Sequence, residues 1–189
     1  MTKEFLITQL ENIENAKRKN RDRVATIVLK NNELFPFLLK ITFDVNNKIS
    51  IKAAWILELV CEQQLDFIVP HLPYFVENIS LVKFESAIRP LSKICNFIAI
   101  AYNSKTDNLI KSTLLKSEIN TIIEASFDWM IGNHKVAAKA YAMNTLYIFG
   151  KNIDWVHPEL KLLIEQNMAI QSAAYKARGR MTLALINKK

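Results

Sequence analysis

Hydrophobic positions recur along most of the chain at the spacing of amphipathic helices. In residues 2–17 the apolar side chains include Phe5, Leu6 and Leu10, which fall on one helical face. Residues 49–61 are apolar over a wider arc, which is typical of a helix buried between others. The pattern predicts helices along the whole length.

Glycine is scarce, with only 3 in 189 residues. Sheet proteins use glycine at hairpin turns and bulges, so this shortage favours helices joined by Asn- and Ser-containing turns. Half of the residues are hydrophobic and 23% are charged, a balance that supports a packed core. We therefore predict one all-α domain over residues 1–189.

The predicted helices form pairs with a shared arrangement. Proline recurs in the first helices, and the second helices carry a small residue, next to a lysine in three of four pairs. The small residues are Ala53, Ala87, Ala140 and Ala177. Their spacing is that of helix-pair repeats, apart from a polar insertion at residues 101–116, which we expect to be irregular. A small residue at such a position lets neighbouring helices cross closely.

This arrangement resembles HEAT repeats, of the armadillo-type helical repeat class, over residues 33–187. The resemblance implies a right-handed α-α superhelix, a short α-solenoid of about five antiparallel helix pairs. It also implies a concave face lined by the second helices, on which a non-catalytic scaffold or adaptor binds a protein or peptide.

Residues 17–23 hold the densest charge in a chain whose net charge is +7: five bases and one acid. A solvated loop is the plain interpretation. However, these bases begin a helix, where the helix dipole disfavours positive charge. Acids close by, or an anionic partner, would relieve that cost.

A second group of bases is spread over the second helices: Lys52, Arg89, Lys93, Lys135, Lys139, Lys176, Arg178 and Arg180. On one face they would form a basic stripe able to follow a phosphate backbone. This gives an alternative function, a nucleic-acid-binding or DNA-repair-related protein. Such a stripe resembles that of HEAT-like DNA glycosylases, which also place Trp and Asp residues at the bound base. Here the pairs Asp128-Trp129 and Asp154-Trp155 fall on first helices or turns, away from the concave face, which counts against a glycosylase.

We expect Trp55, beside Lys52, to be a partly exposed aromatic on the same face. The candidate binding residues are Lys17, Arg18, Lys19, Arg21, Arg23, Lys52, Trp55, Arg89, Lys139, Lys176 and Arg180.

The residues with catalytic or metal-binding chemistry form no recognisable motif. His71, His134 and His157 are far apart, and we interpret them as surface or helix-end residues. Cys61 and Cys95 lie in apolar runs, as buried free thiols do. No metal-ligand spacing, glycine-rich loop or nucleophile elbow is present, so we predict no catalytic residue, metal or cofactor. An all-helical enzyme is a third alternative without a recognised site.

Glu58 and Glu62 are four residues apart. Glu58 lies between Leu57 and Leu59 on a helix with a wide apolar face, a position that would bury it in part and raise its pKa. We favour the alternative for the pair, a solvated helix face. No apolar run is long enough for a membrane helix. The lack of a membrane helix indicates that the chain has no membrane partner. The two unpaired cysteines favour the reducing cytoplasm. The expected partner is a protein or peptide, with nucleic acid as the alternative.

Overall fold

The computed structural model describes residues 1–188; Lys189, the last residue of the predicted domain, lies outside them. Within the described residues the chain has eleven α-helices, three short 3-10 helices and no β-strand, so the all-α prediction is confirmed. The α-helices are α1 (Lys3–Glu11), α2 (Arg18–Lys30), α3 (Phe35–Thr42), α4 (Ile49–Gln63), α5 (Leu72–Asn78), α6 (Glu85–Tyr102), α7 (Leu109–Thr113), α8 (Lys116–Ile131), α9 (Val136–Phe149), α10 (Val156–Asn167) and α11 (Ala173–Ile186). The 3-10 helices are η1 (Asn32–Leu34), η2 (Leu65–His71) and η3 (Ile79–Leu81).

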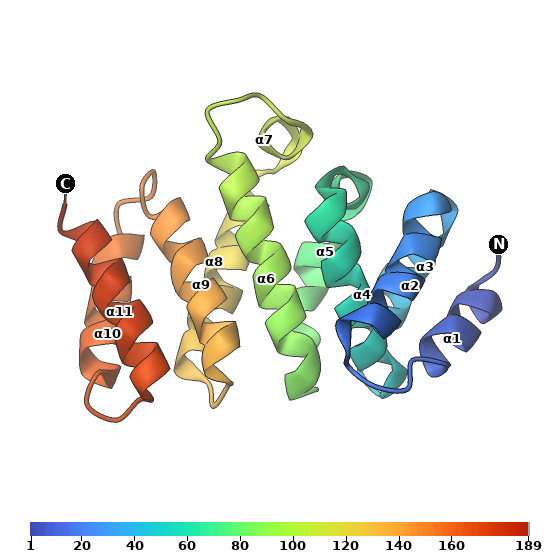
Figure 1. Cartoon of the computed structure of the whole chain (residues 1–189). Helices are drawn as coiled ribbons and strands as arrows, with labels where there is room; N and C mark the ends of the chain where they lie inside the picture. Colours follow the sequence, from blue (N-terminus) through green and yellow to red (C-terminus); the bar gives the residue numbers. More distant parts are fainter. Residues whose placement is uncertain (189) are drawn as a thin grey trace.

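The helices lie in two layers, with the termini at opposite ends of the row (Figure 1). We call α2, α4, α6, α9 and α11 the front layer; each packs against the next. Behind them, α3 packs on α4, α8 on α9, and α10 on both α9 and α11. One continuous cluster of buried side chains, from Leu6 to Tyr175, fills the space between these helices.

Side chains at the helix starts explain several boundaries. The hydroxyls of Thr2 and Ser172 each accept a hydrogen bond from the backbone N–H three residues later in the sequence, and these bonds cap α1 and α11. The helix α8 begins at Lys116, with Leu115 at its N-cap. There the Glu118 carboxylate accepts the backbone N–H of Leu115 at 2.8 Å.

Proline has a different effect at each of three positions. Pro36 occupies the first turn of α3, where the missing N–H costs nothing. Pro70 lies in η2, so α5 begins only after it. Pro90 lies inside α6, which begins five residues earlier at Glu85 and continues past the proline.

The insertion is not wholly irregular, contrary to expectation. Residues 101–116 include the short helix α7, capped by the Asn108 side chain, which accepts the N–H of Lys111. The Asn108 amide also donates to the carbonyl of Ala101 at 2.8 Å. Ile110 and Leu114 are buried, and these two apolar anchors explain why the segment folds back onto α6 and η2.

Of the four small residues predicted to lie where helices cross closely, only the first two are buried as such a position requires. Ala53 and Ala87 are fully buried. Ala140 is half-buried and Ala177 is exposed, so the crossing points assigned to α9 and α11 are wrong.

The close approaches in α9 and α11 occur at neighbouring positions. The Ser92 hydroxyl of α6 donates to the carbonyl of Ala138 at 2.9 Å, which brings α6 and α9 together there. In α11 the close residue is Gly179, where a Cβ atom would lie 2.9 Å from Cγ2 of Ile164 in α10. The register thus depends on the facing helix rather than on the repeat pattern alone.

We expect Ala53→Leu to lower the free energy of unfolding by about 1–3 kcal/mol, because the larger side chain overpacks a closed site. Ala177→Leu is the matched control and should change it by less than about 0.5 kcal/mol, since that position is exposed. Urea titration followed by circular dichroism measures both. Equal effects of the two substitutions would contradict the packing described for α4.

Candidate functional site

A buried carboxylate, that of Glu58, organises the centre of the front layer. Its side chain is 3% exposed. From α6, Arg89 donates to both carboxylate oxygens, Nη1 to Oε1 at 3.1 Å and Nη2 to Oε2 at 2.6 Å. Lys93, one turn further along α6, donates to Oε1 at 3.0 Å. Our interpretation of Glu58 as solvated was wrong, because two bases from a helix distant in the sequence compensate its burial.

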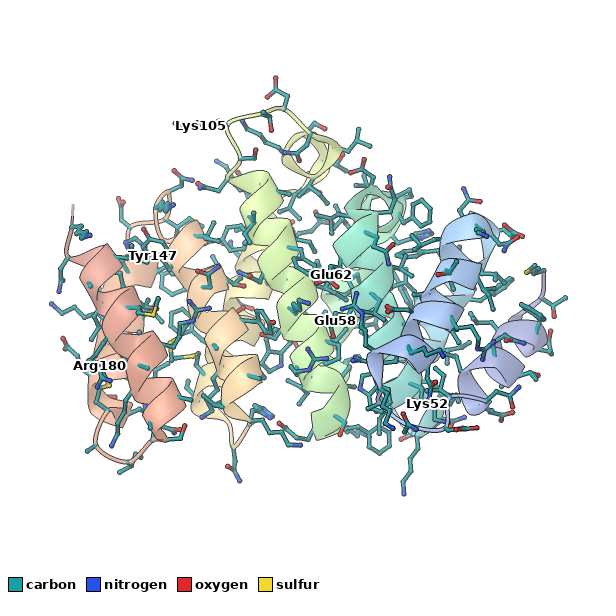
Figure 2. The ribbon with its side chains drawn as sticks, in the orientation of Figure 1. Lys52, Glu58, Glu62, Lys105, Tyr147 and Arg180 are labelled. Atoms are coloured by element: carbon teal, nitrogen blue, oxygen red, sulfur yellow. The ribbon has the colours of Figure 1, made fainter. Side chains whose placement is uncertain are left out.

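This ion-pair network continues across α4 to α2. Lys93 also contacts Glu62 at 2.7 Å, and Arg18 of α2 contacts the same carboxylate at 3.2 Å. Arg18 further pairs with Asp22 at 2.7 Å. Figure 2 shows Glu58 and Glu62 near the middle of the front layer. Three bases therefore meet three acids, and the middle of the predicted basic stripe carries no excess of positive charge.

The pKa values of Glu62 and Lys93 shift in opposite directions, each toward the charged form. Burial raises the pKa of Glu62, but the hydrogen bond and charge of Lys93, with those of Arg18, outweigh burial and bring the pKa below its ordinary value. Burial lowers the pKa of Lys93, and its hydrogen bonds with Glu62 and Glu58 outweigh that effect and raise it. Both residues therefore favour their charged forms.

A second carboxylate joins α6 to the turn before α9. One carboxylate oxygen of Glu85 lies 2.6 Å from Nδ1 of His134, and the other accepts a hydrogen bond from the backbone N–H of Lys135 at 2.8 Å. Burial raises the pKa of Glu85, but these two contacts outweigh burial and lower it. Glu85 thus fixes the start of α9 relative to α6.

Between these two carboxylates lies a pocket of about 480 Å³, which we call the front pocket. Its walls come from α2, α4, α6 and the residue before α9. The lining residues are Ala16, Arg18, Arg21, Trp55, Glu58, Glu85, Ser86, Arg89 and Lys135. The Trp55 indole N–H donates to the carbonyl of Ser86 at 3.2 Å, which holds the ring as one wall.

Three bases in or beside the front pocket have no ion pair or hydrogen bond through their side chains within residues 1–188. Arg21 and Lys135 line it, and Nε of Arg21 is buried with no partner. Lys139 lies one turn after Lys135 on the same side of α9 and is 4% exposed. Burial lowers the pKa of Lys139, and the charge of Glu85 opposes this only in part. These groups leave positive charge that the fold itself does not neutralise.

The structure brings only some of the predicted binding residues together. Arg18, Arg21, Trp55 and Arg89 meet at the front pocket, with Lys139 beside it. The bases of residues 17–23 do have acids close by, as their place at a helix start predicted. Only Arg18 forms ion pairs with them, to Asp22 and Glu62.

The other predicted residues point elsewhere or bind the backbone. Arg23 donates to Gln9 at 2.6 Å, Lys52 to the carbonyl of Glu11 at 2.9 Å, and Lys176 to the carbonyl of Ala169 at 3.2 Å. Lys17 and Lys19 are exposed, as is Arg180 on α11 (Figure 2).

Sequence reasoning gave too little weight to one carboxylate that shapes the site and missed the other. The position of Glu58 between Leu57 and Leu59, on a helix with a wide apolar face, had indicated partial burial, but the solvated face was preferred. For Glu85 no local signal exists, because His134 and Lys135 are about fifty residues away.

The remaining candidates for chemistry are structural. His157 is buried rather than exposed: its ring stacks on Tyr147 with centroids 5.5 Å apart, and Nε2 lies 2.8 Å from the carbonyl of Tyr147. Cys61 and Cys95 are buried free thiols, as predicted, and burial raises their pKa values.

Residues 1–188 contain no group of three His, Cys, Asp or Glu side chains placed to hold a metal ion. Nor does any helix among them have the length and apolar character to cross a membrane. Comparison with protein-family models, curated proteins and solved structures finds no match to this chain.

We expect Glu58→Gln to lower the free energy of unfolding by roughly 2 kcal/mol or more, because it removes the charge that compensates two partly buried bases without changing the volume. Glu62→Gln, at a more exposed carboxylate, should cost less than about 1 kcal/mol. Urea unfolding at neutral pH measures both. A smaller loss at Glu58 than at Glu62 would contradict the central role of Glu58.

Acid should weaken the fold through Glu62 and Glu85. Because the pKa of each is lower in the folded chain, each stabilises fully above its ordinary value of 4.5, and the stabilisation disappears as the pH falls through the folded pKa. Glu85→Gln should flatten the dependence of unfolding free energy on pH between about pH 5 and 3. Glu124→Gln, at an exposed residue of α8, is the control and should leave the slope as in the wild type.

Proposed function

We propose that this chain is a HEAT-like repeat scaffold that binds an acidic segment of a partner protein at the front pocket. The two-layered row of helices supports the repeat architecture. In this proposal α2, α4, α6, α9 and α11 are the second helices of about five antiparallel pairs in a right-handed superhelix, and the front layer is its concave face.

The observation that carries the proposal is the unequal use of bases on the front layer. Arg89, Lys93 and Arg18 are paired with carboxylates of the chain itself. Arg21 and Lys135, which line the front pocket next to the indole of Trp55, are not. A pocket with unpaired cations beside a flat aromatic wall suits a short acidic segment with an apolar or aromatic neighbour.

Nucleic acid is the second candidate, favoured by the exposed Lys17 and Lys19 at the start of α2. A phosphate backbone crossing the front layer would meet the carboxylates of Glu58, Glu62 and Glu85 along its path. Since backbone binding depends on a continuous run of unpaired cations, this interruption favours a partner that contacts one pocket.

Selection from a random peptide library displayed on phage tests the proposal. Enriched peptides should be rich in Asp and Glu with an aromatic residue nearby. Arg21→Glu should weaken their binding at least roughly tenfold, because it places an acid in the pocket. Arg180→Glu changes the net charge equally but lies on α11, outside the pocket lining, and should bind as the wild type does.

Two results would count against the proposal: peptides without acidic residues, or equal losses in the two variants. Retention on duplex DNA that falls steeply with salt, and that Arg21→Glu abolishes, would favour the nucleic-acid alternative instead.

A further inference from the structure

We propose that the front pocket recognises a phosphorylated side chain of the partner, a proposal that rests on the acidic-segment function above. The pocket joins two unpaired bases, Arg21 and Lys135, with a fixed aromatic wall, and a third, Lys139, lies beside it one turn further along α9. A phosphoryl monoester on a peptide matches that combination in charge, in acceptor geometry and in size.

The unpaired charge in and beside the pocket suits a dianion. Arg21, Lys135 and Lys139 offer three positive charges that no carboxylate of the described chain pairs with. A carboxylate side chain brings one negative charge, whereas a phosphoryl monoester carries about −1.5 to −2 at neutral pH and three acceptor oxygens. The dianion therefore neutralises more of the excess than an Asp or Glu side chain can.

The guanidinium group of Arg21 also lacks an acceptor. Nε of Arg21 is shielded from solvent and makes no hydrogen bond. A buried donor without an acceptor destabilises the folded chain, and an anion in the front pocket would supply one. Guanidinium groups bind phosphoryl oxygens particularly well because their donors form a planar fork.

The acids of the pocket are already paired with other groups of the chain. Glu58 is bound by Arg89 and Lys93, and Glu85 by His134 and the backbone N–H of Lys135. Their charges are compensated locally, so they repel an incoming anion little. They also hold Arg89 and the start of α9 in place, which keeps the pocket preformed.

The size and walls of the pocket suit a phosphorylated side chain. At about 480 Å³ it exceeds the volume of a lone phosphate, which leaves space for the side chain that carries the phosphoryl group. Trp55 is held by its bond to Ser86, so its ring presents a fixed surface beside the cations. A phosphotyrosine ring would lie against this surface, whereas phosphoserine would leave it uncovered.

Calorimetric titration with matched peptides tests the inference. The probes are one short neutral peptide with phosphotyrosine, phosphoserine, glutamate or unmodified tyrosine at its centre, together with inorganic phosphate and adenosine monophosphate. Both phosphopeptides should bind at least tenfold more tightly than the glutamate peptide, and phosphotyrosine more tightly than phosphoserine.

Variants locate the binding. Lys139→Met, which keeps the length of the side chain, and Lys135→Gln, at an exposed position, should each weaken phosphopeptide binding about tenfold. Lys52→Gln, whose ammonium group binds the carbonyl of Glu11, should not weaken it. Because Lys135 is exposed, its substitution tests the inference even if Lys139→Met fails to fold.

Several results would overturn the inference. If the glutamate peptide binds as tightly as the phosphopeptides, the phosphoryl preference is wrong while the acidic-segment function stands. If display peptides bind and phosphopeptides do not, the phosphoryl preference is likewise wrong and the acidic-segment function stands. Tighter binding of adenosine monophosphate than of phosphotyrosine would indicate a nucleotide site instead. If neither display peptides nor phosphopeptides bind, both proposals fail.

Discussion

The contact between Glu58 and the two bases of α6 is the interaction on which the front layer depends. A carboxylate as deeply buried as this one is unfavourable unless it is paired, and Arg89 and Lys93 supply three hydrogen bonds to it. Since these donors lie on successive turns of α6, they fix both the distance and the register between α4 and α6. The walls of the front pocket are parts of these same helices.

The network also decides where positive charge is available. Glu58 and Glu62 neutralise the bases at the middle of the front layer, although the chain as a whole carries +7. The charge that remains unpaired lies at Arg21 of α2 and at Lys135 and Lys139 at the start of α9, on helices to either side of α4 and α6. A basic composition therefore becomes a localised site rather than a continuous stripe, and this difference separates the proposed peptide partner from nucleic acid.

Much of the fold follows from the sequence because helices are local. The three- and four-residue periodicity and the shortage of glycine predicted an all-helical chain correctly. The packing register between helices was harder to predict from the sequence. Ala53 is buried as predicted, but the close contact of α11 is at Gly179 rather than Ala177. Such positions are set by the facing helix, whose placement a repeat pattern does not contain.

The site was predicted only in part for the same reason. Arg21 and Trp55 were recognisable as a base and an aromatic on candidate front-layer helices, and they do line one pocket. The burial of Glu58 and the contact of Glu85 with His134 depend on helices brought together by folding. Pairing between distant residues decides which bases are free, and no spacing along the chain reveals it.

The central claim is that Glu58 and Arg89 hold the front layer together as a coupled pair. A double-mutant cycle with Glu58→Ala, Arg89→Ala and the double variant measures that coupling directly from urea unfolding. We expect a coupling energy of about 1.5 kcal/mol or more, as is usual for hydrogen-bonded charges that are buried away from water. A coupling below about 0.5 kcal/mol, with the two losses simply additive, would contradict it.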